Sequence, residues 1–472
     1  MKRHPNIVLI LVDDMGWRDI GCMGSSFYET PHLDRLAAQG MLFTDAYAAC
    51  PVCSPTRASI MSGKYPARVG VTDWIDHGGS AHPLHGYLVD APYVKQLPLS
   101  ECSLARALRE GGYQTWHFGK WHLGDEPYWP ERHGFDVNVG GCHYGHPPVG
   151  YFSPWQIPTL EDRSPGEYLP DRLTDEAIRR IDTRDPDRPF FLNLWYYCVH
   201  TPIQARPEKI EKFRRKARAM GLDRIDPFVY GEYFPIREKG NERVRRRVLQ
   251  SDPAYAAMIE SVDENIGRLL ARLDETGIAD DTVVIFTSDN GGLATAEGSP
   301  TCNAPLSEGK GWMYEGGTRE PLLIRCPGMT APGSRCGVPV TSPDFYPTLL
   351  ELAGVPPRPE QHVDGVSLVP LLRGGTELPR EAIFWHYPHY GNQGGTPGSS
   401  VRSGDWKLIE FFEDGRLELY NLRRDPGEKE NRAAAEPEIA ARLLELLRNW
   451  RREVEALLPA AGDPPFFRRR LS

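Results

Sequence analysis

Residues 6–16 read NIVLILVDDMG, an almost unbroken apolar run followed directly by two acidic residues. Runs of this kind, rich in Val, Ile and Leu, are typical of a strand buried on both faces of a parallel sheet. The run is too short for the apolar core of a signal peptide, and acids rather than small residues follow it. The stretch therefore predicts a central strand that ends at Asp13 and Asp14.

Three more apolar runs lie further along the chain, with helical patterns between them. They read YQTWHF (113–118), FFLNLWYY (190–197) and TVVIFTS (282–288). A 3-4 spacing of apolar residues from 259 to 273 predicts a helix with one buried face. Strands that alternate with helices predict an α/β fold, with a mostly parallel sheet covered on both faces.

Polar side chains follow each of these four strands shortly after the strand ends. They are Asp13 and Asp14, Lys120 and His122, His200, and Asp289 with Asn290. Sites in parallel sheets form at the carboxyl ends of the strands. We therefore expect these side chains to lie close together in one site.

The charge balance disfavours two classes of partner. The chain has 472 residues, with 55 Lys and Arg against 64 Asp and Glu, and a formal net charge of −9. Nucleic acids and anionic membranes both attract basic surfaces, and no apolar run reaches the ~18 residues that cross a bilayer. We expect no nucleic-acid or membrane partner and a cytoplasmic location, or a secreted or periplasmic one if a leader has been trimmed.

The pattern of elements predicts two domains. Residues 1–375 carry the alternating strands and helices, and residues 376–472 read as antiparallel strands followed by an amphipathic helix, a smaller α+β domain. Within the first domain, residues 205–250 contain basic runs mixed with acids and aromatic residues. This segment predicts a solvated helical insertion, with a lid over the site as the alternative.

The stretch CPVCSPTR (50–57) places Cys50 and Cys53 three residues apart. This spacing is found in redox dithiols and in zinc sites, but a zinc site needs four ligands and no second such pair exists in the chain. We expect Cys50 to be a buried, packed thiol. The nine cysteines are scattered and predict no disulfide framework, while a bridge between Cys326 and Cys336 stays open.

Two strand ends offer hard oxygen ligands, Asp13-Asp14 and Asp289-Asn290. Such oxygens suit Ca²⁺ or Mg²⁺ better than zinc. The alternative is that one acid of each pair caps the next helix, but adjacent buried acids repel each other unless a cation lies between them. The cationic and imidazole groups around them describe a pocket for an oxyanion ester. These groups are Arg57, Lys120, His122, His200 and Lys310.

Several ordered segments resemble the type I sulfatase family over residues 5 to about 430. CSPTR (53–57) is similar to the C-x-P-S/T-R motif, with Thr56 where Ser is commoner, and GYQTWHFGKWHLG (112–124) is similar to the second family motif. IVLILVDDMG, VHTP around His200, FTSDNGG and EGKGWMYEGGTREP are similar to further family segments. The resemblance implies an alkaline-phosphatase-like α/β/α sandwich with a small C-terminal domain.

The resemblance also implies the chemistry. Cys53 would be oxidised to Cα-formylglycine by a formylglycine-generating enzyme, and one hydroxyl of the hydrated aldehyde would attack sulfur. The second hydroxyl would then release sulfate, so no water has to attack sulfur. Asp13, Asp14, Asp289, Asn290 and the oxygen at Cys53 would hold Ca²⁺, with Mg²⁺ as the alternative. Arg57 would fix the nucleophile, Lys120 and Lys310 would bind sulfate, and His122 and His200 would share the base and acid roles.

The resemblance implies a sulfated carbohydrate as substrate, or another sulfated small molecule. His and aromatic residues of FWHYPHYGNQGG (384–395), above all His386 and His389, are candidates for binding a sugar ring, with Trp74 and His77 as weaker ones. Ordinary hairpin packing is the alternative for this segment. Other classes stay open: an aryl sulfatase without sugar specificity, a phosphodiesterase or phosphonate monoester hydrolase, and a non-catalytic binding protein.

Overall fold

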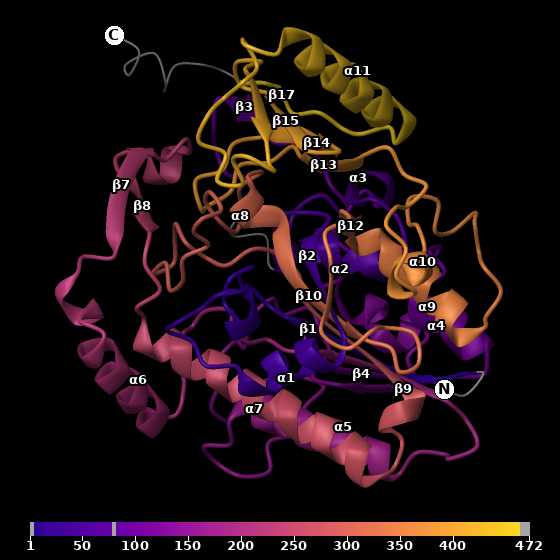
Figure 1. Ribbon diagram of the computed structural model, residues 1–472. Coiled ribbons are helices and arrows are strands. Elements are labelled where there is room, and N and C mark those ends of the chain that lie inside the picture. Colours follow the sequence, from indigo (N-terminus) through magenta and orange to yellow (C-terminus); the bar gives the residue numbers. More distant parts are fainter. Residues whose placement is uncertain (1–3, 78–81, 463–472) are drawn as a thin grey trace.

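A large, mostly parallel sheet forms the centre of the computed structural model, which describes residues 4–77 and 82–462 (Figure 1). The strand order is β11-β2-β10-β9-β1-β6-β4-β5, and β12 also pairs with β2. The strands are β1 (Asn6–Val12), β2 (Met41–Tyr47), β4 (Gln114–Gly119), β5 (Val137–Val139), β6 (Phe190–Trp195), β9 (Thr282–Ser288), β10 (Arg319–Arg325), β11 (Ser334–Cys336) and β12 (Val340–Thr341). β10 runs antiparallel to both of its neighbours, β9 and β2.

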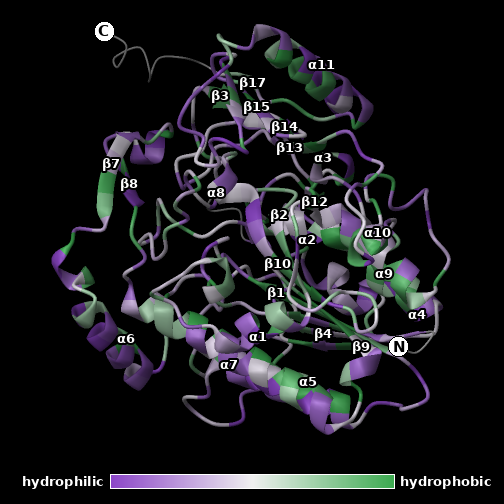
Figure 2. Cartoon of the chain, in the orientation of Figure 1, coloured by the Kyte–Doolittle hydropathy of each residue, from purple (hydrophilic) through white to green (hydrophobic). Residues whose placement is uncertain are grey.

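The predicted central strand is confirmed. β1 lies between β6 and β9 and pairs with both in parallel, so that Ile7 is level with Phe191 on one side and Val283 on the other. Its residues from Ile7 to Val12 are buried, because helices cover both faces of the sheet. Figure 2 shows these hydrophobic strands at the core of the molecule.

Successive side chains of β1 enter two different cores, as the pleat of a strand requires. Val8, Ile10 and Val12 pack in one core with the helices α1, α5, α6 and α7, and Ile7, Leu9 and Leu11 pack in the other with α2, α4, α9 and α10. The helices of the first face are α1 (Pro31–Gln39), α5 (Leu169–Asp182), α6 (Pro207–Ala219) and α7 (Pro253–Glu275). Those of the second face are α2 (Cys53–Ser62), α4 (Leu104–Glu110), α9 (Phe345–Ala353) and α10 (Val369–Leu372). The chain therefore forms the expected α/β/α sandwich.

The segment 205–250 is only partly helical, which corrects the expectation of a helical insertion. α6 packs against α7, but β7 (Phe228–Tyr233) and β8 (Arg243–Arg247) then form an antiparallel hairpin. Val244 and Arg247 of β8 are buried, and Arg245 and Arg247 both lie over the ring of Phe228. Cross-strand contacts between arginine and an aromatic ring stabilise a hairpin, which the helical interpretation of these basic runs overlooked.

A small antiparallel sheet follows the sandwich. Its order is β13-β14-β15-β16, and α11 packs on one side of it. The elements are β13 (Ile383–Tyr387), β14 (Gly398–Ser403), β15 (Trp406–Phe411), β16 (Leu417–Asn421) and α11 (Pro437–Glu453). The short elements α3 (Pro66–Val69), α8 (Glu315–Thr318), β3 (Leu88–Val89) and β17 (Ala460–Ala461) complete the helices and strands. The predicted boundary after residue 375 falls between α10 and β13.

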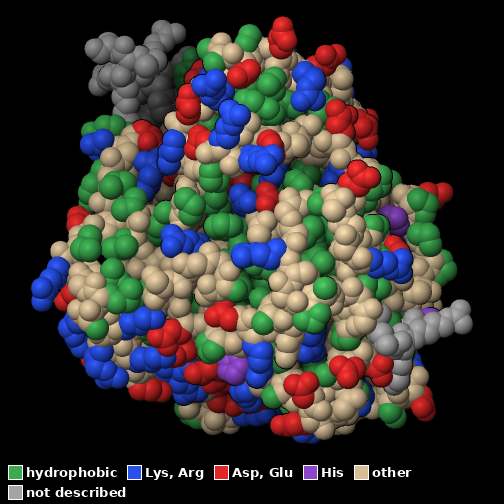
Figure 3. Space-filling model, in the orientation of Figure 1, with side chains coloured by type: hydrophobic (Ala, Val, Ile, Leu, Met, Phe, Trp, Pro, Cys, Tyr) green, Lys and Arg blue, Asp and Glu red, His purple; other side chains and the backbone are tan. Residues whose placement is uncertain are grey.

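The surface mixes both signs of charge. On the face shown in Figure 3, basic and acidic side chains are interspersed rather than separated into patches. Among the described residues, no helix combines the length and the apolar character needed to cross a membrane.

Candidate active site

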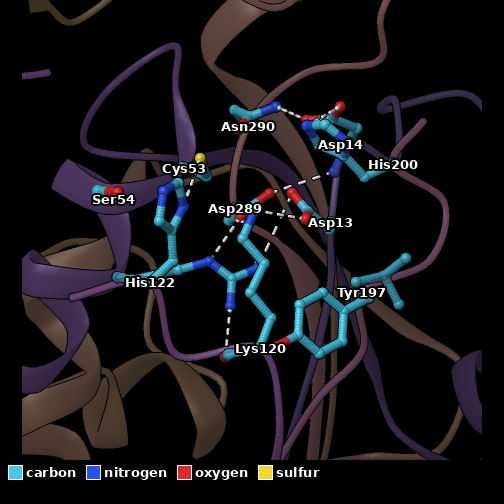
Figure 4. Close-up of polar contacts among 12 residues, drawn as sticks. Asp13, Asp14, Cys53, Ser54, Lys120, His122, Tyr197, His200, Asp289 and Asn290 are labelled. Carbon is cyan, nitrogen blue, oxygen red and sulfur yellow. Dashed lines mark hydrogen bonds and ion pairs between the residues drawn. The ribbon is translucent and has the colours of Figure 1, made fainter. Parts of the chain in front are cut away.

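The side chains that follow the four strands come together as predicted, because β9, β1, β6 and β4 are neighbours in that order. Figure 4 shows them converging from these strand ends on one site. Beyond two of the strand ends, one residue adopts the left-handed backbone conformation. Asp14 has a φ of 61° and His122 a φ of 58°. Non-glycine residues rarely adopt this conformation, and it concentrates at functional sites.

Three buried carboxylates form the floor of the site. Asp13, Asp14 and Asp289 each place an oxygen within 4.8 Å of the other two. Burial and the charge of Asp289 raise the pKa of Asp13 well above its usual value. Burial alone would also raise the pKa of Asp14, but Lys310 and His200 bring it below its usual value. Acids held this close favour a bound cation.

Two oxygen atoms of this group are left without hydrogen-bond partners. Asp13 Oδ1 and Asn290 Oδ1 are buried and accept no hydrogen bond, whereas Asn290 Nδ2 donates to Asp14 Oδ1 over 2.8 Å. Buried oxygens without a partner are rare in proteins. The four residues Asp13, Asp14, Asp289 and Asn290 therefore fit a hard divalent cation such as Ca²⁺.

Three cations surround the carboxylates. Lys120 Nζ lies 2.5 Å from Asp13 Oδ2, and Lys310 Nζ lies 2.8 Å from Asp14 Oδ2. Arg57 donates through Nε to Asp289 Oδ2 over 2.8 Å and through Nη1 to the carbonyl oxygen of Lys120 over 2.9 Å. The guanidinium of Arg57 is fully buried and rigidly held, so it joins α2 to two strand ends.

Cys53 is the first residue of α2, and Arg57 follows one turn later on the same face of the helix. The Sγ atom of Cys53 lies 3.3 Å from His122 Nδ1. Burial raises the pKa of the Cys53 thiol, although Lys120 and Lys310 oppose the shift. A thiol with a raised pKa is a poor nucleophile at neutral pH. The side chain therefore needs further activation if it is to attack a substrate.

Cys50 has a different environment and is buried, as expected. It packs with Val52 and Trp385 in the core shared with the small sheet, and burial raises the pKa of its thiol. Redox dithiols need at least one thiol of low pKa, which neither Cys50 nor Cys53 provides. Cys326 and Cys336 are likewise separate thiols.

Thr56 explains how the motif tolerates threonine in place of serine. Its Oγ1 accepts from the amide of Cys50 over 3.2 Å and donates to the carbonyl oxygen of Cys50 over 3.1 Å. Both bonds use the hydroxyl, which serine and threonine share.

The two histidines face the site with different atoms. His122 donates from Nε2 to the carbonyl oxygen of Ile75 over 2.8 Å, which leaves Nδ1 as an acceptor toward Cys53. His200 donates from Nδ1 to the carbonyl oxygen of Thr201 over 2.9 Å, and its Nε2 lies 3.7 Å from Asp14 Oδ2. Burial, together with Lys120, lowers the pKa of His122 well below its usual value. Burial and Lys310 lower the pKa of His200 to about 4.

A cavity of about 580 Å³ opens above Cys53. Of the predicted residues, Cys53, His122, His200 and Lys310 line it, and so do Trp74 and His77. The remaining lining residues are Ile75, Asp76, Tyr144, Gly145, His146, Pro148, Thr201, Pro202, Glu297, Asn392 and Gln393. Arg57, Lys120 and the carboxylates lie beneath this lining, in the buried floor.

Two of the predicted sugar-binding residues, His386 and His389, lie outside the cavity. His386 bonds to Ser399 Oγ and to the carbonyl oxygen of Leu457, and His389 bonds to Thr72 Oγ1 and Asp90. Both side chains are buried, and neither lines the cavity. Instead, the loop that follows β13 carries Asn392 and Gln393 to the cavity wall. In the segment FWHYPHYGNQGG, the amide residues of the glycine-rich end, rather than the histidines, were the sequence signal for the cavity wall.

None of the residues 205–250 lines the cavity, so the lid interpretation finds no support in the described part of the chain. The hairpin instead contacts the loop that carries Lys310. Arg246 Nε lies 2.7 Å from a carboxylate oxygen of Glu308, and its guanidinium lies over the ring of Trp312.

The sequence matches the family profile described as Sulfatase over residues 5–355, and the profile described as N-sulphoglucosamine sulphohydrolase, C-terminal, over residues 308–453. It is 30% identical to the N-acetylgalactosamine-6-sulfatase of Homo sapiens, over 97% of this chain and 87% of that protein. It is 32% identical to the arylsulfatase A of Homo sapiens, over 94% of this chain and 87% of that protein. The crystal structure of Ps i-CgsB in complex with k-i-k-neocarrahexaose superimposes with a TM-score of 0.76 at 28% identity, over 95% of this chain and 92% of that one.

Proposed function

The chain belongs to the sulfatase family of sulfuric ester hydrolases, and on that premise we propose that it hydrolyses the sulfate monoester of a saccharide with a formylglycine made from Cys53. The observation that carries the proposal is the composition of the cavity floor. Lys310 and His200 line the cavity beside Cys53, above buried acids that fit a divalent cation. An anionic ester would be held there by local cations, although the whole chain is acidic.

The residues around the strand ends would hold Ca²⁺ through Asp13, Asp14, Asp289 and Asn290, with Mg²⁺ as the alternative. The two unpartnered oxygens, Asp13 Oδ1 and Asn290 Oδ1, support this assignment. The position of Cys53 at the start of α2, on the cavity wall and beside an imidazole acceptor, fits the modified residue. When present, the formylglycine would supply a hydrated aldehyde with two hydroxyls, and the cation would neutralise charge on the sulfate oxygens.

The chain's own groups have distinct tasks in this proposal. Lys310 binds a sulfate oxygen from the cavity wall, while Lys120 and Arg57 hold the charged floor together from below. His122 accepts a proton at Nδ1, because its Nε2 proton is committed to the carbonyl oxygen of Ile75. His200 also lines the cavity, and as the imidazolium, protonated at both ring nitrogens, it would pass its Nε2 proton to the leaving oxygen.

The substrate class rests on the cavity wall and on the relatives. Trp74 offers an aromatic face to a sugar ring, and the amides of Asn392 and Gln393 offer hydrogen bonds to hydroxyl groups. One relative is named N-acetylgalactosamine-6-sulfatase, and one solved relative is in complex with k-i-k-neocarrahexaose. A formylglycine-generating enzyme would be the partner during maturation.

The experiment measures sulfate release from a panel of sulfated mono- and oligosaccharides. The protein is produced together with a formylglycine-generating enzyme, and Cys53→Ala is compared with Cys50→Ala as the matched control. We expect Cys53→Ala to abolish release and Cys50→Ala to retain most of it, since Cys50 lies outside the cavity.

Two outcomes would contradict the proposal. Release by Cys53→Ala at the wild-type rate would exclude position 53 as the source of the nucleophile. Faster hydrolysis of phosphate diesters or phosphonate monoesters than of every sulfated saccharide would show that the enzyme's main reaction is a different one.

A further inference from the structure

A second set of metal-type ligands lies beside the cavity, outside the site described above. Asp73, His82 and Asp90 each place a ligand atom within 4.8 Å of the other two, and His389 lies next to them. The side chains of Asp73, His82 and His389 are 0%, 4% and 0% exposed, and that of Asp90 is 10% exposed. The four come from two distant parts of the chain, the loops between α3 and α4 and the loop after β13. They lie behind Trp74, whose ring is 4.6 Å from that of His82.

Two of the distances between the ligand atoms, both from Asp73 Oδ2, are close to those of a tetrahedral site. Asp73 Oδ2 lies 3.6 Å from His82 Nε2 and 3.9 Å from His389 Nδ1, and His389 Nδ1 lies 2.7 Å from Asp90 Oδ1. Zinc–ligand bonds of about 2.0–2.1 Å imply ligand atoms about 3.4 Å apart in a tetrahedron. The separations of Asp73 Oδ2 from His82 Nε2 and from His389 Nδ1 exceed this value by only about 0.2 and 0.5 Å.

Three buried atoms of the cluster have no hydrogen-bond partner. They are Asp73 Oδ2 and both ring nitrogens of His82. A buried carboxylate oxygen or imidazole nitrogen without a partner is costly, and such atoms are rare in native proteins. Two of the three, Asp73 Oδ2 and His82 Nε2, face each other across the gap. A cation bound between them would accept an electron pair from each.

The outer atoms of two of these ligands, Asp73 and His389, are already held in place. Asp73 Oδ1 accepts from the amide of Trp74 over 2.8 Å and from Tyr387 Oη over 3.0 Å. His389 Nε2 lies 2.8 Å from Thr72 Oγ1, which leaves Nδ1 directed toward Asp73 and Asp90. Outer hydrogen bonds of this kind fix the orientation of metal-bound histidines and carboxylates.

We propose that Asp73, His82, Asp90 and His389 bind a zinc ion. Two imidazoles and two carboxylates match the ligand preference of Zn²⁺, whereas the all-oxygen site at the strand ends matches Ca²⁺ or Mg²⁺. Four protein ligands close the coordination sphere, so this zinc has a structural role. It fastens the loop that carries Trp74 to the loop after β13, which carries Asn392 and Gln393, and so it fixes two walls of the cavity.

The experiment measures metal content of the full chain. Protein stripped with a chelator is incubated with Ca²⁺ and Zn²⁺ and desalted, and its zinc is counted by mass spectrometry; Co²⁺ replaces Zn²⁺ in a parallel sample, where its visible absorption reports tetrahedral geometry. His82→Gln and Asp90→Asn remove one ligand each. His143→Gln alters a different, more exposed His-Asp-His group (His77, Asp125 and His143), and Asp289→Asn alters the strand-end site.

We expect about one tightly bound zinc per chain in the wild type, in His143→Gln and in Asp289→Asn, and its loss in His82→Gln and Asp90→Asn. Zinc should also raise the Tm of the wild type but not that of His82→Gln. Equal zinc content in the wild type and His82→Gln would overturn the proposal. So would wild-type protein that retains no zinc, which would mean that water satisfies the unpartnered atoms.

Discussion

His386 illustrates how strongly burial controls a single residue. Burial lowers its pKa to about 3, while an unfolded histidine titrates near ~6.5. As the pH falls, the unfolded state therefore binds this proton before the folded state does. The contribution of neutral His386 to the unfolding free energy is fully present above the pKa of the unfolded state and is lost as the pH falls toward 3. Wild-type protein should lose about 2 kcal/mol more unfolding free energy between pH 7 and pH 5 than His386→Gln does.

Denaturant unfolding at the two pH values measures this difference. The same variant tests whether His386 binds substrate, since its side chain lies outside the cavity. We expect sulfate release at neutral pH close to that of the wild type. A large loss of activity without a loss of stability would show that His386 contributes to substrate binding.

At the scale of elements, the hairpin β7–β8 supports the site from outside the cavity. Arg246 pairs with Glu308, and burial raises the pKa of that carboxyl while Arg246 opposes the shift. Glu308 lies two residues before Lys310, so loss of the pair leaves a buried acid unpaired next to a sulfate-binding group. Arg246→Ala should cost about 1–3 kcal/mol of stability and lower kcat about tenfold.

Arg243→Ala is the matched control, because this arginine lies on the same strand with an exposed side chain. Its stability should stay within about 0.5 kcal/mol of the wild type. Denaturant unfolding and steady-state sulfate release measure both variants. An unchanged kcat in Arg246→Ala would mean that the hairpin does not position the Lys310 loop.

At the scale of the whole molecule, the parallel sheet and the floor of the site were predictable from the sequence. Strand periodicity located β1, β4, β6 and β9, and the polar residues beyond their ends met because those strands are neighbours. The cavity wall was not predictable in the same way. Glu297 and the 392–393 amides come from loops, whose positions depend on packing between distant segments rather than on local periodicity. For this reason the sequence pointed to His386 and His389, whereas the structure places Asn392 and Gln393 on the cavity wall.

The two sheets are joined by a buried ion pair. Lys407 Nζ of β15 lies 2.9 Å from Glu315 Oε1 of α8, with both side chains fully buried, and 3.1 Å from Glu428 Oε1. Removal of the cation leaves an uncompensated buried carboxylate, so Lys407→Met should cost about 3–5 kcal/mol of unfolding free energy.

Arg423→Ala serves as the control for Lys407→Met. Arg423 pairs with Asp405 at the surface with its side chain 82% exposed, and its loss should cost about 0–1 kcal/mol. Chemical denaturation measures both variants. A cost below about 1 kcal/mol for Lys407→Met would show that the buried pair does not join the two domains.

The most direct measurement of the proposed chemistry is the mass of the tryptic peptide 36–57, which carries both Cys50 and Cys53, from protein that releases sulfate. We expect Cys53 to have lost its sulfur and to carry an aldehyde or its hydrate, while Cys50 in the same peptide remains a thiol. Active protein in which Cys53 is an unmodified thiol would contradict the formylglycine mechanism.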